Sequence, residues 1–199
     1  MIDYCKKMYL ILLNTAIILI KKFLINYKVD NLLLFVKIKT SREVVEMPLL
    51  IEKNRITNAI DVAKFLLYNA YKDGDCITNL KLQKLLYYAQ AWYLVNFKKK
   101  LFEEPIQAWQ YGPVVESVYK KYCKYGNSPI TEKINPNHLN LSLDQKDYLT
   151  DYCFNFFRYS ATELVTMTHR EDPWINAYAK GKGSIISTCE MQEFYSALV

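Results

Sequence analysis

Apolar residues recur with helical spacing along most of the chain after residue 56, which predicts a mainly α-helical domain. Between residues 59 and 71 they fall every three or four positions, as on the buried face of a helix. We expect Thr57 to cap this helix and Gly74 to lie just beyond its end. From Thr78 onward a second helix is apolar on most sides, which is typical of a central helix packed by several neighbours.

Local signals mark the remaining elements. The segment 105–111 is too short and too broken for a helix, so it predicts an extended strand. Gly112 allows an unusual backbone angle, and Pro113 suits the first turn of the next helix. Further helix starts are expected at capping patterns that begin at Ser142, Ser160 and Ser187. The pattern predicts a compact single domain of about six helices with at most a short β element.

The first part of the chain differs from this domain. Residues 1–47 are an apolar and basic N-terminal extension, and residues 48–199 are the organised domain. The run after Lys7 has the shape of a signal-peptide core, but it is shorter than the ~20 residues of a membrane span. Three interpretations stay open. The extension is a membrane-associating or core-covering segment, an arm that packs on a partner, or an upstream read-through with the true start at Met47.

The distribution of charge disfavours nucleic acid as a partner. The formal net charge is +6, yet residues 1–46 hold eight Lys and Arg against four Asp and Glu, while residues 47–199 hold eighteen against sixteen. Phosphate binding requires a concentrated basic surface, which a nearly neutral domain does not supply. A regulator that binds DNA is therefore a minor alternative.

The residues that could carry chemistry predict neither an enzyme nor a metal or cofactor site. Five widely spaced cysteines without a C-x-x-C pair suit a reducing cytoplasm. His169, close to Glu171 and Asp172, is the one cluster that resembles a catalytic group, and no nucleophile stands at a recognised spacing from it. We expect this histidine to bond the backbone or to brace Trp174.

Four stretches in this order resemble the Panacea antitoxin domain, a SocA-like, GepA-type family of phage-associated proteins. They cover roughly residues 58–195 and comprise LKLQKLLYYAQAW, AWQYGPVVESVY, SATELVTMTHREDPW and a capped helix at the end of the chain. The resemblance implies a cytoplasmic antitoxin of a toxin–antitoxin system. Its partner would be a cognate protein toxin encoded by a neighbouring gene, commonly in a prophage. An alternative within the family is an adaptor that delivers the toxin to a Clp-type protease.

The signature positions of the family fall into two groups in this sequence. Those expected to form toxin contacts at the surface are Lys84, Tyr88, Trp109 and Tyr111. Those expected to be structural are Leu82, Gln83, Leu85, Tyr87, Gly112, Pro113, His169, Pro173 and Trp174. A membrane partner would follow only if the N-terminal extension is real.

Overall fold

The structure is a computed structural model that describes residues 33–39, 44–50 and 57–198. The chain divides into two compact units, Met1–Asn54 and Arg55–Val199. The signal-like stretch lies outside the described residues, and whether residues 1–46 are translated stays a prediction.

In the first unit the described residues form an antiparallel hairpin. Strand β1 (Leu33–Lys39) pairs with β2 (Val44–Leu50), and Val36 is opposite Met47. Strand β2 thus runs across the expected boundary between residues 47 and 48. The division between the compact units falls after Asn54.

Residues 57–198 contain seven α-helices and one short hairpin, which confirms the mainly α fold class. The helices are α2 (Ala59–Lys72), α3 (Asn79–Phe97), α4 (Glu116–Tyr122), α5 (Leu143–Phe156), α6 (Ala161–Thr168), α7 (Asp172–Ala179) and α8 (Thr188–Ser196). The hairpin consists of β3 (Gln107–Trp109) and β4 (Gly112–Val114), and two single 3-10 turns are at Cys123–Tyr125 and Pro136–His138. None of the described helices is long and apolar enough to cross a membrane.

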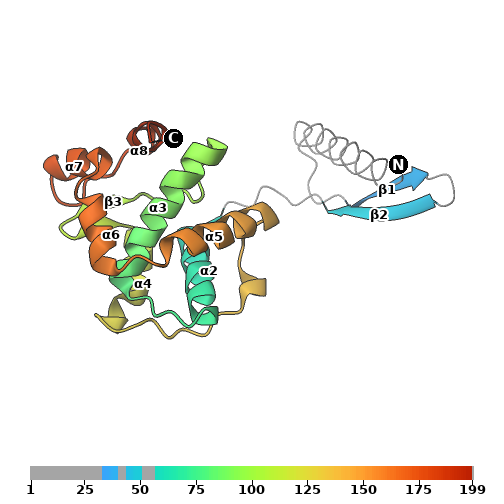
Figure 1. The fold of residues 1–199 in the computed structure, drawn as a ribbon, viewed down its shortest axis with the longest axis horizontal. Coiled ribbons are helices and arrows are strands. Elements are labelled where there is room, and N and C mark those ends of the chain that lie inside the picture. Colours follow the sequence, from blue (N-terminus) through green and yellow to red (C-terminus); the bar gives the residue numbers. More distant parts are fainter. Residues whose placement is uncertain (1–32, 40–43, 51–56, 199) are drawn as a thin grey trace. The chain divides into compact units, whose positions relative to one another are not determined.

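Helix α3 is the centre of this unit. It contacts α2, α4, α5, α6, α8 and β4. Figure 1 shows these helices around it. Because it has neighbours on so many sides, fourteen of its nineteen residues are buried, from Asn79 to Leu94. The prediction of a central helix that is apolar on most sides is therefore confirmed.

The predicted helix starts are mostly correct because capping depends on local sequence. Thr78 accepts the backbone N–H of Lys81, and both Ser142 and Ser160 form complete capping boxes. The Ser187 side chain caps α8 by accepting the backbone N–H of Glu190. The end of α2 is also as expected, since Gly74 adopts a φ of +74°.

Two predicted helix starts are wrong. Asn58, and not Thr57, caps α2, because the Thr57 hydroxyl lies inward and contacts Gln145 Oε1 at 2.7 Å. Pro113 lies in β4 instead of in the first turn of a helix, and α4 begins only at Glu116. A contact with a distant segment replaced the local preference at Thr57, whereas at Pro113 the pairing of β4 with β3 did so.

Candidate functional site

Lys84 and the β3–β4 hairpin form the most unusual polar contact of the domain. The Lys84 side chain is fully buried, and its Nζ donates a hydrogen bond to the carbonyl oxygen of Pro113 at 2.8 Å. Burial disfavours the charged ammonium and lowers the pKa of Lys84 to about 7. The lysine therefore holds the second strand of the hairpin against α3.

Gly112 leaves the space that the Lys84 side chain occupies. A Cβ atom at this position would lie 2.8 Å from Lys84 Cε and 2.8 Å from Thr168 Oγ1, closer than van der Waals contact allows. The backbone φ of +97° also favours glycine. The Gly-Pro pair of the sequence is thus explained by the lysine that lies against it.

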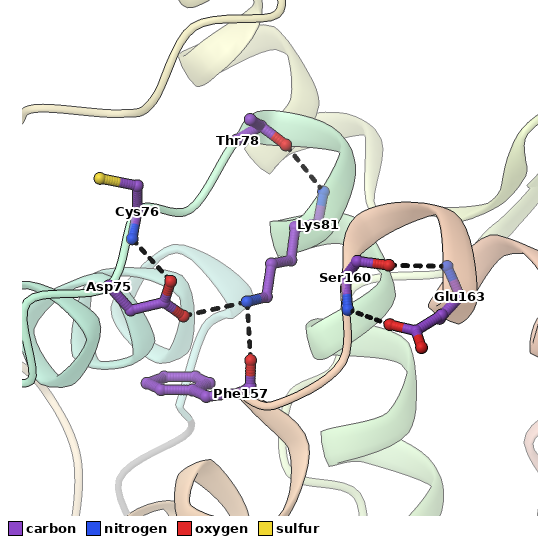
Figure 2. Close-up of polar contacts among 7 residues, drawn as sticks. All are labelled: Asp75, Cys76, Thr78, Lys81, Phe157, Ser160 and Glu163. Carbon is purple, nitrogen blue, oxygen red and sulfur yellow. Dashed lines mark hydrogen bonds and ion pairs between the residues drawn. The ribbon is translucent and has the colours of Figure 1, made fainter.

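The other polar side chains of α3 also bind loops or neighbouring strands. Gln83 accepts the N–H of Val115 at 2.9 Å, and Gln90 accepts the N–H of Leu101 at 2.8 Å. Figure 2 shows Lys81, whose Nζ is 2.9 Å from Asp75 Oδ2 and 2.8 Å from the carbonyl oxygen of Phe157. Because Gln83, Gln90 and Lys81 each have a hydrogen-bond partner, the burial of these three side chains costs little stability.

A half-buried carboxylate lies one turn further along α3, beside Tyr88. Glu171 accepts hydrogen bonds from the hydroxyls of Tyr88 at 2.9 Å and Tyr195 at 2.6 Å. Burial raises the pKa of Glu171, and the tyrosine hydroxyls oppose this shift by stabilising the carboxylate. The ring of Tyr87 packs edge to face on Tyr88 with the centroids 5.2 Å apart. The cluster joins α3, α7 and α8.

His169 stacks on Trp174 with ring centroids 4.2 Å apart, which confirms that it braces this tryptophan. Trp174 Nε1 donates to the carbonyl oxygen of Trp109 at 3.2 Å, so the stack also supports β3. Burial lowers the pKa of His169, with the charge of Lys84 as a smaller cause. In the described part of the chain, no three His, Cys, Asp or Glu residues are placed to hold a metal ion.

The exposed side of the hairpin carries aromatic and apolar side chains. Tyr111 is 65% exposed in the turn, and the half-buried ring of Trp109 packs on Tyr119 at 5.0 Å. Ile185, which is bridged to Gln107, is also exposed. We call these four side chains, Trp109, Tyr111, Tyr119 and Ile185, the hairpin surface.

Comparison with known proteins assigns the family. The family model described as "Antitoxin SocA-like, Panacea domain" matches residues 82–175. The protein Antitoxin SocA of Caulobacter vibrioides (strain NA1000 / CB15N) is 30% identical over 149 residues, which cover 69% of this chain and 79% of that relative. The chain belongs to the SocA-like Panacea family of antitoxins. No solved structure matches it.

Most signature residues of the Panacea domain lie in its interior. Leu82, Leu85 and Tyr87 are fully buried, Pro113 is buried in β4, and Pro173 is in the first turn of α7. Gln83, Gly112 and Trp174 are buried as well, and His169 is half-buried. That all of these positions are structural stays a prediction.

The expected surface group divides in two. Lys84 and Tyr88 are 0% and 1% exposed, so the prediction that they lie at the surface is wrong. The reason is that Lys84 fits against Gly112 and Tyr88 reaches Glu171, two partners that are distant in the sequence. Trp109 and Tyr111 do reach the surface, and their contact with a toxin stays a prediction. Sequence reasoning did not include Tyr119 and Ile185, whose apolar character alone resembles that of core residues.

Proposed function

We propose that this Panacea-domain protein is the antitoxin of a toxin–antitoxin pair and neutralises, by direct binding, a protein toxin encoded by a neighbouring gene. We further propose that it acts in the cytoplasm and that its gene is associated with a prophage. The similarity to Antitoxin SocA over 149 residues is the observation that carries the proposal. An antitoxin of this kind has to present a surface for its partner on a stable scaffold.

The hairpin surface is suited to such a contact. Tyrosine and tryptophan are the residues that most often anchor protein interfaces, because they bury a large area at a low cost in side-chain entropy. Here β3 and β4 are fixed from behind by Lys84 and by Trp174, so the exposed rings are positioned before binding. A preorganised contact loses less entropy when the partner binds.

Co-expression with the product of the neighbouring gene tests the proposal. The wild-type chain should restore growth, and Tyr111→Ala should weaken both the rescue and the affinity for the toxin by about tenfold or more. Tyr71→Ala is the matched control, since Tyr71 is 86% exposed on α2 and lies outside the segment that matches the family model. If the wild-type chain neither binds the toxin nor restores growth, the proposal is wrong.

A proteolytic adaptor is the alternative within the family. It predicts that protection disappears in a host without its Clp-type protease, whereas direct binding predicts that protection remains. The same co-expression assay in the two hosts separates these mechanisms.

A further inference from the structure

A groove lies between the second half of α3 and helix α5. Its volume is about 740 Å³. Its walls carry six aromatic rings, namely Trp92, Tyr93, Phe97, Tyr148, Tyr152 and Phe156. Phe97 is 43% exposed, and Trp92, Tyr148 and Phe156 are half-buried, so the rings form an accessible apolar floor.

Ring contacts and hydrogen bonds hold the aromatic floor in place. Tyr93 lies 4.5 Å from Phe97 and 5.0 Å from Tyr148 between ring centroids, and Phe97 meets Tyr148 edge to face. The hydroxyls of Tyr148 and Tyr152 donate to carbonyl oxygens of α3 at 2.8 Å. Turning either tyrosine into the groove would break its hydrogen bond to α3.

The rim of the groove is acidic. Asp144, Asp147 and Asp151 line it at positions i, i+3 and i+7 of α5, which places them on one face of the helix. All three are exposed, and none forms an ion pair with another described residue. Lys99 is the one basic residue of the lining, so three aspartates face one lysine.

The same helix carries two exposed apolar side chains beside this rim. Leu143 is 64% exposed and lies four residues before Asp147, while Phe154 is 88% exposed and lies three residues after Asp151. Residues at these spacings follow one another along a helix surface. The outer side of the rim therefore offers apolar anchors as well as carboxylates.

These features indicate which class of ligand suits the groove. Aromatic faces attract cations, and carboxylates next to them strengthen that preference. Single-stranded nucleic acid also stacks on aromatic rings, but it requires a positively charged groove, and the sign here is opposite. A polypeptide segment with Lys or Arg side chains and apolar residues between them is complementary to both the rim and the floor.

We propose that this groove docks a basic segment with apolar anchors from the protein toxin. The inference rests on the proposed function, because it takes the toxin as the partner that supplies the segment. Lys or Arg side chains of the segment pair with Asp147 and Asp151, and its apolar residues cover Phe97 and Tyr148. The groove is thus a second contact in addition to the hairpin surface.

Reversing the charge of Asp147 and Asp151 tests this contact. The full chain is titrated with the purified product of the neighbouring gene. In isothermal titration calorimetry, Asp147→Lys together with Asp151→Lys should raise the dissociation constant about tenfold or more. Asp147→Asn together with Asp151→Asn keeps the side-chain shape and should give a smaller increase. The affinity of the wild-type chain should also fall between about 50 mM and about 300 mM salt, because salt screens exposed charges.

The matched control is Asp73→Lys together with Glu193→Lys. It changes the net charge equally at two exposed sites that do not line the groove, and it should leave the affinity within about twofold of wild type. Circular dichroism confirms that each variant is folded. If both groove variants bind the toxin as tightly as the control, the groove inference is wrong while the antitoxin proposal stands. If the wild-type chain does not bind the toxin at all, both are wrong.

Discussion

In the first half of α3, Lys81 and Lys84 are buried and bonded to acceptors within the protein, whereas the second half borders a groove whose aspartates lack an ion-pair partner among the described residues. In the first half, Lys84 bonds to the β3–β4 hairpin, and Lys81 bonds to Asp75 and to the carbonyl group of Phe157. Beside the second half, the aspartates of α5 are exposed to solvent or to a partner. A signature lysine therefore belongs to the scaffold here, and the acidic rim of the groove consists of residues that the sequence motifs did not select.

The largest effect is expected from removing the buried lysine. Lys84→Ala should lower the free energy of unfolding by about 3 kcal/mol, because it leaves a cavity and an unsatisfied Pro113 carbonyl group. Lys84→Met restores much of the volume and should cost about 1 kcal/mol. Urea denaturation measures both, with the exposed Lys182→Ala as a control that should change stability very little. A loss for Lys84→Ala no larger than for the control would contradict the structural role of Lys84.

Gly112→Ala should cost about 2 kcal/mol. The new Cβ atom would collide with Lys84 Cε and Thr168 Oγ1, and the backbone φ of +97° is unfavourable for alanine. The same denaturation experiment with Gly126→Ala is a useful comparison, because Gly126 also has a positive φ but has open space around it. An equal loss at both glycines would show that backbone strain alone, without the Lys84 contact, determines the cost.

The pH dependence of stability should also reveal the lowered pKa of Lys84. Its pKa is about 7 in the folded protein and near 10.5 when unfolded, so above pH 7 the unfolded chain binds more protons than the folded one. The free energy of unfolding should therefore rise between pH 7 and pH 9, by about 1 kcal/mol per pH unit from this group. Comparison with Lys84→Met cancels the other titrating groups. Identical slopes for the two proteins would contradict a buried lysine with a lowered pKa.

The smallest effect is expected at the groove. Asp147→Asn together with Asp151→Asn should change the free energy of unfolding by less than about 0.5 kcal/mol, with a slight gain because two like charges four residues apart repel each other. Thermal denaturation measures this difference. A large loss of stability would mean that the aspartates belong to the scaffold, and the contrast between the two halves of α3 would disappear.

Local sequence was enough for features with local causes. The caps at Thr78, Ser142, Ser160 and Ser187 need only the following turn, and the stack of His169 on Trp174 joins residues only five positions apart in the chain. The central position of α3 followed from its apolar residues on most sides. Membership of the family likewise followed from ordered motifs.

The errors arose where distant segments meet. Thr57 bonds to Gln145, 88 residues away, and so is not the cap that its position suggested. Lys84 is buried because it reaches a carbonyl group 29 residues further along the chain, which no spacing on α3 reveals. The groove likewise exists only because α5 packs beside α3, although the aspartates of α5 share a helix face that the sequence alone could have indicated.

Growth rescue in a host that lacks the Clp-type protease tests the central claim most directly. Cells that express the product of the neighbouring gene should grow when this chain is co-expressed, and they should grow equally well with and without the protease. Rescue that requires the protease, or no rescue in either host, would contradict neutralisation by direct binding.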